Sequence, residues 1–268
     1  MTIKRNEPTP PPAAADLLER PLTARSVIAS LLLGRHPPAA PVALLVRWCA
    51  LFGISETSAR VTLSRMVERG ELSAAEATYE LAGRVRGRQA DQDFAFAPEL
   101  EPWDGRWSMA VVREGRRDPT ARAALRAALA RSRMAPVREG VWVRPHNLAD
   151  GVATAADRRT IAAQCSWWVG APSSALDVEA LFSMRSWAAR GRTLLERLVL
   201  ETSRLPAESA LADAFVVGAA AAQHLRRDPL LPAELLPRRW PGDELRARYA
   251  AYVRAMDRAV RAWTRAAL

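Results

Sequence analysis

The side chains best placed to contact another molecule lie between Ser55 and Gly70. We expect a helix here, and at about 100° per residue its apolar stripe, predicted to face the core, is made of Ala59, Leu63, Met66 and Val67. The opposite side carries short hydroxyl groups, arginines and a valine. In the DNA major groove, hydroxyls reach phosphates or base edges, arginine can pair with guanine, and valine can meet a thymine methyl group. We therefore predict these DNA-contacting residues: Ser55, Thr57, Ser58, Arg60, Val61, Ser64 and Arg65.

A basic stretch follows at residues 84–88. Arg84 and Arg86 are predicted to contact the phosphate backbone, which adds affinity but carries no sequence information. The net charge of +10 also fits a polyanionic partner, because guanidinium groups match phosphate oxygens. The alternative is that these arginines and hydroxyls lie on ordinary solvated faces of a protein from an arginine-rich genome, so charge alone does not decide.

The elements around this segment favour DNA binding over a plain solvated face. Thr23 can cap a helix over 22–33, and Pro41 can open a second helix over 42–52. A tight turn at 53–55 leads into the helix capped by Ser55, which Gly70 ends. Two short extended pieces follow at 71–73 and 78–81. Helix, helix, turn, helix and a two-stranded ribbon is the order of a winged helix-turn-helix.

The rest of the chain predicts a second sheet and a helical end. We expect a strand over 106–113, a helix over 118–133, a strand region at 141–143 preceded by the stretch 135–137, a short helix within 149–159 and a strand over 161–169. Strand, helix, strand, strand, helix, strand is the ferredoxin-like order. After Pro172 the pattern is helical, with a proline-rich loop over 228–242. The predicted class is α+β. The predicted parts are a disordered tail (1–20), a winged-helix domain (21–90), a linker (91–102), a ferredoxin-like domain (103–172) and a helical C-terminal domain (173–268).

Several classes of protein are disfavoured by the sequence. Cys49 and Cys165 lie in apolar stretches and read as core residues of a reduced compartment, not as a disulfide framework. The histidines are scattered, so we expect no metal site and no cofactor. No nucleophile elbow, P-loop or glycine-rich dinucleotide motif occurs, so we expect no catalytic residues. The longest apolar run is too short for a membrane span, and no signal peptide is visible, which predicts a cytoplasmic protein without a membrane partner.

Three parts of the chain carry a resemblance to a known family. The predicted helix over 55–70 ends in Arg69-Gly70. The middle part contains Pro102-Trp-Asp-Gly-Arg-Trp107 and, at 138–145, Arg-Glu-Gly-Val-Trp-Val-Arg-Pro. Residues 224–242 have the sequence His-Leu-Arg-Arg-Asp-Pro-Leu-Leu-Pro-Ala-Glu-Leu-Leu-Pro-Arg-Arg-Trp-Pro-Gly. In this order they resemble the PaaX family of transcriptional repressors, named for phenylacetate degradation. The resemblance covers residues 21–245.

The resemblance implies a homodimeric repressor with the three-part fold predicted above. It also implies a double-stranded DNA operator and an effector, an aryl-acyl-CoA such as phenylacetyl-CoA, that releases the DNA. One departure concerns the strand after Trp107, which is followed by Glu114-Gly115-Arg116 where relatives continue into an Ile-Pro-Glu turn. This departure leaves open the alternative that the protein regulates other catabolic or secondary-metabolite genes and responds to a different effector.

A CoA-type effector needs basic groups for its phosphates and an apolar pocket for its acyl part. The predicted effector-binding residues are Arg106, Trp107, Trp142, Arg144, Trp167, Trp168 and His224, with Arg226 and Arg227 as further phosphate candidates. The alternative for each tryptophan is core packing. For His224 it is a structural hydrogen bond near a helix end.

Two other functions compete with a regulator. The ferredoxin-like order also occurs in CRISPR-associated spacer-acquisition nucleases, which place a metal-binding aspartate at the end of the first strand. Here that strand ends in Val112-Arg113, and the nearest acid is Glu114, so a metal nuclease is disfavoured. The other alternative is a protein-binding scaffold whose winged helix does not bind DNA.

Overall fold

The computed structural model describes residues 14–18, 22–113, 115, 118–148 and 154–266, and combines helices with two antiparallel sheets, as in α+β proteins. It divides into two compact units. The first unit comprises Met1–Gln89, Thr193–Ala222 and Ala247–Leu268, and the second comprises Ala90–Arg192 and Gln223–Arg246. Within the segment predicted as a disordered tail, η1 (Ala14–Leu17) is a 3-10 helix with buried end residues.

The N-terminal part of the first unit contains α1 (Ala24–Leu33), β1 (Ala39–Pro41), α2 (Val42–Ala50), α3 (Glu56–Glu68), β2 (Leu72–Ala75) and β3 (Thr78–Leu81). The strands pair in the order β1-β3-β2, with antiparallel neighbours. Thr23 caps α1 in a reciprocal arrangement with Ser26, and Ser55 caps α3. The predicted caps of both helices are thus present. Each cap side chain accepts a hydrogen bond from an amide that the first helical turn leaves unpaired.

The core face of α3 is narrower than the sequence suggests. Ala59, Leu63 and Met66 are buried, with at most 1% exposure. Val67, which we expected on the same stripe, is 37% exposed, so that prediction is wrong. It follows Met66 by one residue, and one step of about 100° carries its side chain off the buried line.

Gly83 fixes how the chain leaves the β2–β3 hairpin and enters α4 (Gly83–Phe96). Its φ is +52°, and a Cβ there would lie 2.6 Å from the carbonyl oxygen of Gly70, just after α3. Only glycine allows this close approach of two backbones. The start of α4 is therefore held beside the end of α3.

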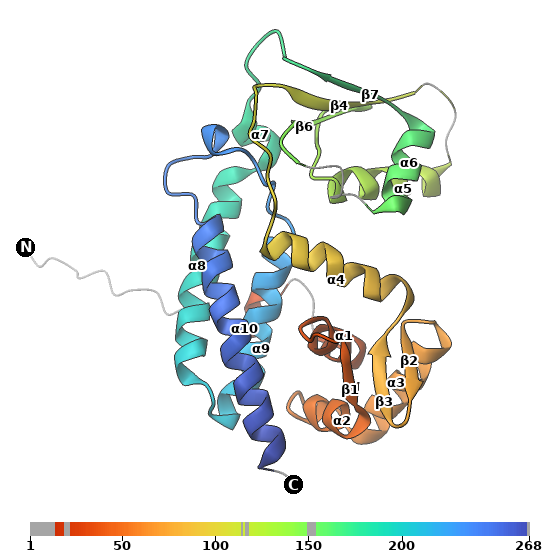
Figure 1. Cartoon of the computed structure of the whole chain (residues 1–268), viewed down its shortest axis with the longest axis vertical. Coiled ribbons are helices and arrows are strands. Elements are labelled where there is room, and N and C mark those ends of the chain that lie inside the picture. Colours follow the sequence, from red (N-terminus) through yellow and green to blue (C-terminus); the bar gives the residue numbers. More distant parts are fainter. Residues whose placement is uncertain (1–13, 19–21, 114, 116–117, 149–153, 267–268) are drawn as a thin grey trace, which may run out of the picture. The chain divides into compact units, whose positions relative to one another are not determined.

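The second unit contains β4 (Trp107–Val112), α5 (Pro119–Arg131), β5 (Ala135–Arg138), β6 (Val141–Pro145), α6 (Ala155–Gln164) and β7 (Cys165–Gly170). The strand order is β5-β6-β4-β7, all antiparallel. Helices α5 and α6 lie on the same side of this sheet (Figure 1). Their core is built from Ala110, Leu125, Ala128, Leu129, Met134, Ile161 and Cys165.

The predicted strand over 161–169 begins too early. Residues 161–164 belong to α6, and the strand starts only at Cys165. Asp157 and Ile161 are the buried positions of α6, four residues apart, so Ile161 follows the helical period instead of the two-residue period of a strand.

The C-terminal part is helical, as predicted: α7 (Val178–Phe182), α8 (Met184–Arg204), α9 (Glu208–Leu225), η2 (Ala233–Leu235) and α10 (Gly242–Arg265). Helices α8, α9 and α10 each contribute residues to both units. In the first unit α9 and α10 approach closely, since a Cβ on Gly218 would fall 2.2 Å from the Tyr252 hydroxyl. Among the described helices none is long and apolar enough to cross a membrane.

Candidate nucleic-acid interface

One face of α3 presents every α3 residue that we predicted to contact DNA. The N-cap Ser55 is exposed, and so are the predicted residues of the helix away from the buried stripe: Thr57, Ser58, Arg60, Val61, Ser64 and Arg65. Val61 is an apolar side chain with 45% exposure among these polar groups. The face therefore combines hydrogen-bonding groups, cations and one apolar contact, which are the groups that base edges and phosphates require.

The N-terminal end of α3 is preorganised by its own side chains. Ser55 Oγ accepts a hydrogen bond from the Ser58 amide at 3.3 Å, and Thr62 Oγ1 donates to the Ser58 carbonyl at 2.8 Å. Glu56, which is not among the predicted DNA-contacting residues, pairs with Arg60 at 2.8 Å. This pair places a cation beside the acidic group in the first turn of α3.

An ion pair holds the end of α3 against α1. Arg25 donates two hydrogen bonds to Glu71, at 2.8 and 2.9 Å. The hydrogen bond from Arg25 is the main cause that lowers the pKa of the Glu71 carboxyl, which Arg69 and Arg88 also lower through their charge. The carboxylate thus stays ionised and ties the residue before β2 to α1.

The basic stretch after the hairpin lies at the start of α4. Arg86 is exposed, and its Nη1 lies 3.0 Å from a carboxylate oxygen of Glu80 on β3. The other predicted residue here, Arg84, has a side chain outside the described part of the structure. Arg86 therefore lies exposed at the start of α4, in contact with the hairpin.

An aromatic cluster anchors α2 on the C-terminal helices of the first unit. Trp48 is fully buried, and its ring centroid lies 5.4 Å from that of Phe215 and 5.7 Å from that of Trp263. Arg47 stacks over Trp263 at 3.8 Å and donates to its carbonyl at 3.1 Å. Edge-to-face rings and a cation over a ring are both attractive arrangements. Helix α2, which packs against α3, is thereby fixed to α9 and α10 within the first unit.

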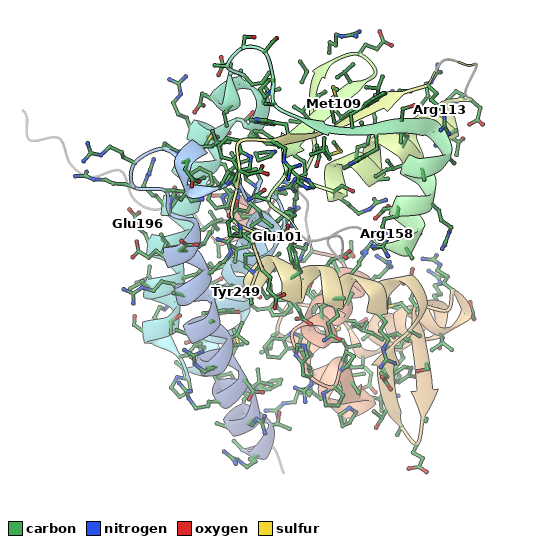
Figure 2. The ribbon with its side chains drawn as sticks, turned by 45° about the horizontal axis from the view of Figure 1, so that its top comes forward. Glu101, Met109, Arg113, Arg158, Glu196 and Tyr249 are labelled. Carbon is green, nitrogen blue, oxygen red and sulfur yellow. The ribbon has the colours of Figure 1, made fainter. Side chains whose placement is uncertain are left out.

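The predicted effector residues do not form one cluster. Strand register places Trp142 and Trp167 opposite Ala110, on the face that α5 and α6 cover. Trp168 pairs with Met109, which precedes Ala110 on β4 and is labelled in Figure 2. Because successive residues of a strand alternate between its faces, Trp168 faces the other side of the sheet. Trp107 shares that other side and is buried, with its ring 6.2 Å from Trp103.

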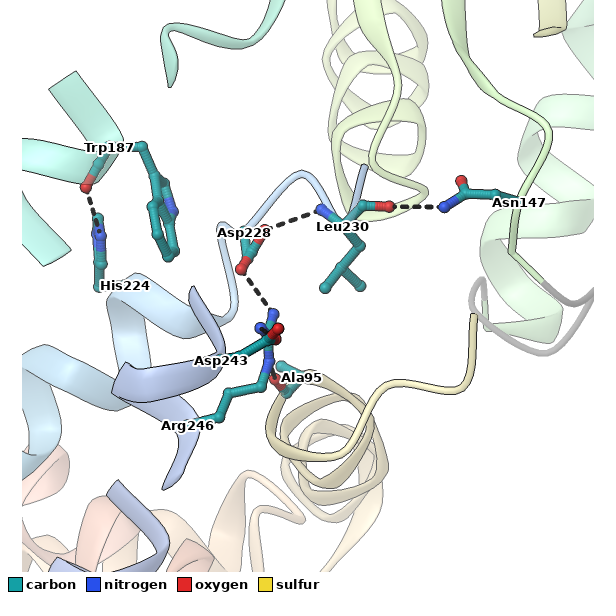
Figure 3. Close-up of polar contacts among 8 residues, drawn as sticks. All are labelled: Ala95, Asn147, Trp187, His224, Asp228, Leu230, Asp243 and Arg246. Carbon is teal, nitrogen blue, oxygen red and sulfur yellow. Dashed lines mark hydrogen bonds and ion pairs between the residues drawn. The ribbon is translucent and has the colours of Figure 1, made fainter. Parts of the chain in front are cut away.

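Two of the predicted effector residues, Arg106 and His224, contact neighbouring side chains or backbone groups of the second unit. Arg106 is exposed and forms an ion pair with Asp104 at 2.5 Å. His224 is buried, stacks on Trp187 with centroids 4.2 Å apart, and donates from Nε2 to the Trp187 carbonyl at 3.0 Å (Figure 3). Trp187 stacks in turn on Trp240. Burial lowers the pKa of His224 to about 4, so the imidazole is neutral at pH 7.

The end of β4 carries a base instead of an acid. Arg113, labelled in Figure 2, follows the strand and donates to the carbonyls of Ala162 and Ala163 at 3.0 and 2.6 Å. Its neighbour Glu114 lies outside the described residues. Within the described ranges, no group of three histidine, cysteine or acidic side chains could hold a metal ion.

Comparisons with known proteins give a consistent assignment. Family models match three consecutive segments: "PaaX-like protein" at residues 23–85, "PaaX protein central Cas2-like domain" at 100–180 and "PaaX-like protein C-terminal domain" at 180–266. The solved structure of the uncharacterized protein Rv0674 from Mycobacterium tuberculosis is 38% identical with a TM-score of 0.69, over 90% of this chain and 98% of that chain. No curated protein matches the sequence. The chain belongs to the PaaX family.

Proposed function

We propose that the protein is a transcriptional regulator that binds an operator in double-stranded DNA through a winged helix-turn-helix. The single observation that carries this proposal is the exposed hydroxyl, arginine and valine face of α3 opposite a buried stripe. Membership of a family of transcriptional regulators supports it. A regulator of this kind acts in the cytoplasm and carries out no chemical reaction.

The elements of the first unit support the winged-helix assignment. Helices α2 and α3 are joined by the turn after Ala50, and the β2–β3 hairpin follows α3 as a wing. In the proposed complex α3 is the recognition helix in the major groove, with Arg65 directed to a guanine. Arg84 and Arg86 contact phosphates, so binding weakens steeply as salt rises.

The proposal is tested by replacing Arg65 with alanine. A bidentate arginine–guanine pair contributes about 1–3 kcal/mol, so the dissociation constant for operator DNA, measured by fluorescence anisotropy, should rise about 5- to 150-fold for each half-site that loses the pair. Arg126, exposed on α5, provides the matched control, and R126A should bind as the wild type does. Equal affinities of R65A and the wild type would leave α3 without its proposed role.

We propose that the second unit's sheet is a ferredoxin-like domain and that it forms the homodimer. The order β5-β6-β4-β7, with α5 and α6 after the first and third of these strands in the chain, supports the fold. The matched family segments support a winged-helix domain at 21–90, a linker at 91–102, a ferredoxin-like domain at 103–172 and a helical domain at 173–268.

The two edges of this sheet differ in a way that supports the dimer. Edge strand β5 contains Pro136 and Arg138 and a register shift between them, features that discourage pairing with another strand. Edge strand β7 has neither proline nor charge, and Trp167, Trp168 and Val169 are 49%, 60% and 40% exposed. Exposed tryptophan is typical of interface centres. A second copy pairing along β7 would cover these side chains symmetrically.

We expect W168R to dissociate the dimer, because a charge would lose its hydration at the centre of the interface. The control is V137R on β5, where Val137 is 44% exposed and no partner is proposed. Sedimentation velocity should give a dimer for the wild type and V137R and a monomer for W168R. A dimeric W168R protein would contradict a dimer interface along β7.

We propose further that the regulator is a repressor released by an aryl-acyl-CoA such as phenylacetyl-CoA. A ligand shifts DNA affinity only by its different affinities for the DNA-bound and free forms. The family assignment supports such an effector, and the predicted residue Arg144 is buried in the second unit, where the charge of Arg133 acts on it.

A further inference from the structure

The last turns of α10, the dark blue helix in Figure 1, carry a row of exposed arginines outside the predicted DNA-contacting residues. Arg254, Arg258, Arg261 and Arg265 are all exposed and follow one another at steps of four, three and four residues. Residues with this spacing lie one above another on the same face of a helix. At a rise of about 1.5 Å per residue, the row extends over roughly 16 Å. We call these four residues the α10 arginine row.

The opposite side of α10 is buried and fixes the helix within the first unit. Tyr252, Val260 and Trp263 are at most 6% exposed. The Trp263 indole donates a hydrogen bond to Glu208 at the start of α9 at 2.8 Å, and its ring centroid lies 5.7 Å from that of Trp48 on α2. The arginine row therefore lies on the solvent side of a firmly packed helix, in the same compact unit as α3.

The arginine row has little acidic compensation. Asp257 is the only acidic residue between residues 245 and 266, and it pairs with Arg261 at 2.9 Å. Within the described part of the chain, no ion pair joins Arg254, Arg258 or Arg265 to a carboxylate. Four positive groups thus stand against one negative group along the row, and three of the four guanidinium groups have their charge unpaired.

The remaining exposed positions of this helix are small. From residue 247 to residue 266, every exposed residue of α10 and its end is either arginine or alanine. Protein interfaces have a core enriched in aromatic side chains, and helices that lie on membranes need large apolar side chains on one face. The row offers neither, so its chemistry favours a partner that is recognised by negative charge and can approach the helix closely.

Double-stranded DNA is the polyanion that fits this surface best. Guanidinium forks match phosphate oxygens, and a duplex presents its phosphates at short, regular intervals. Because the row and α3 belong to the same unit, DNA bound at α3 keeps phosphates at a high local concentration around that unit.

We propose that the α10 arginine row binds the phosphate backbone of DNA outside the bases read by α3. This surface rests on the proposed function and extends it to a part of the chain far from α3 in sequence. In the complex, α3 supplies the base contacts that select the operator. The row supplies affinity and salt dependence that are the same for every DNA sequence.

The test compares two double variants of the full-length protein that lose the same charge. Arg254→Gln with Arg258→Gln removes two neighbouring guanidinium groups from the row. Arg122→Gln with Arg126→Gln, the matched control, removes two exposed guanidinium groups with the same spacing from α5. Each protein is titrated by fluorescence anisotropy, over a range of salt concentrations, against two duplexes of equal length. One carries a site that the wild type has selected from random DNA, flanked by noncognate sequence, and the other is entirely noncognate.

We expect R254Q/R258Q to bind both duplexes at least about tenfold more weakly than the wild type at about 0.1 M salt, with a log–log salt slope shallower by about 2. The two duplexes should be affected by the same factor, because phosphate contacts carry no sequence information. R122Q/R126Q should bind as the wild type does. In R65A, by contrast, affinity should fall mainly for the selected duplex, so the contributions of α3 and of the row are measured separately.

Two results would overturn the role of the row, once urea unfolding curves show that the variants are folded. One is wild-type affinity and salt slope in R254Q/R258Q, which is also the result expected if the row binds an acidic protein instead of DNA. The other is equal weakening in both double variants, which would reflect net charge alone. A wild type that does not prefer its selected duplex would contradict the proposed regulator, whereas a clear preference with an unaffected R254Q/R258Q contradicts only the row.

Discussion

Trp48→Ala is expected to destabilise the protein by about 3–5 kcal/mol, the usual cost of removing a large buried aromatic side chain. Trp48 is fully buried and contacts Phe215 and Trp263. Its removal leaves a cavity between α2 and the two C-terminal helices that α2 packs against in the first unit. The free energy of unfolding from urea titrations, followed by circular dichroism, measures the effect.

Two controls separate packing from other contributions of this side chain. The indole Nε1 of Trp48 is buried without a hydrogen-bond partner, so Trp48→Phe, which removes that donor and keeps most of the volume, should cost less than Trp48→Ala. Leu200→Ala on α8, where Leu200 is 43% exposed, should cost less than about 1 kcal/mol. A loss for Trp48→Ala as small as that for Leu200→Ala would contradict the anchoring of α2.

The second large effect is a loss of stability in acid that depends on His224. The pKa of this imidazole is about 4 in the folded protein and about 6.5 in an unfolded chain. Between these values the unfolded state binds more protons, so stability falls as the pH drops from 6.5 toward 4. At about 1.4 kcal/mol per pKa unit, the loss amounts to about 3 kcal/mol.

The variant that isolates this effect is His224→Gln, which can still donate to the Trp187 carbonyl but does not titrate. Urea unfolding at pH 7.5, 5.5 and 4.5 should show a difference between wild type and H224Q that shifts in favour of H224Q as the pH falls. Carboxyl groups titrate in both proteins and cancel in this comparison. Parallel pH profiles of the two proteins would show that His224 is not held neutral by burial.

Local features of the fold were predictable from the sequence because they depend on neighbouring residues. The caps Thr23, Ser55 and Asp118 each satisfy amides within their own first turn, and the exposed face of α3 follows from helical periodicity alone. The order of strands and helices after residue 106 follows from the same kind of pattern. The boundary errors at Val67 and at residues 161–164 arose where a periodic pattern was extended by a few residues.

Contacts between distant segments were not predictable in this way. No local pattern links Trp48 to Trp263, or Asn147 to Leu230, since each pair meets only in the folded chain. His224 was predicted as an effector residue by its type and by family resemblance, but its stacking on Trp187 and its neutral state depend on burial. Arg144 and Arg226 were predicted as phosphate candidates, but their hydrogen bonds to Asn147 and Gln92 could not be read from the sequence.

The most direct test of the central proposal asks which groove of the operator α3 occupies. Dimethyl sulfate methylates guanine N7 in the major groove and adenine N3 in the minor groove, and methylation interference shows which of these atoms binding requires. The proposed regulator predicts interference at guanine N7 in two half-sites spaced about one helical turn, ~34 Å, apart. In R65A, interference at one guanine per half-site should disappear. Interference only at adenine N3, or a pattern unchanged in R65A, would contradict a major-groove role for α3.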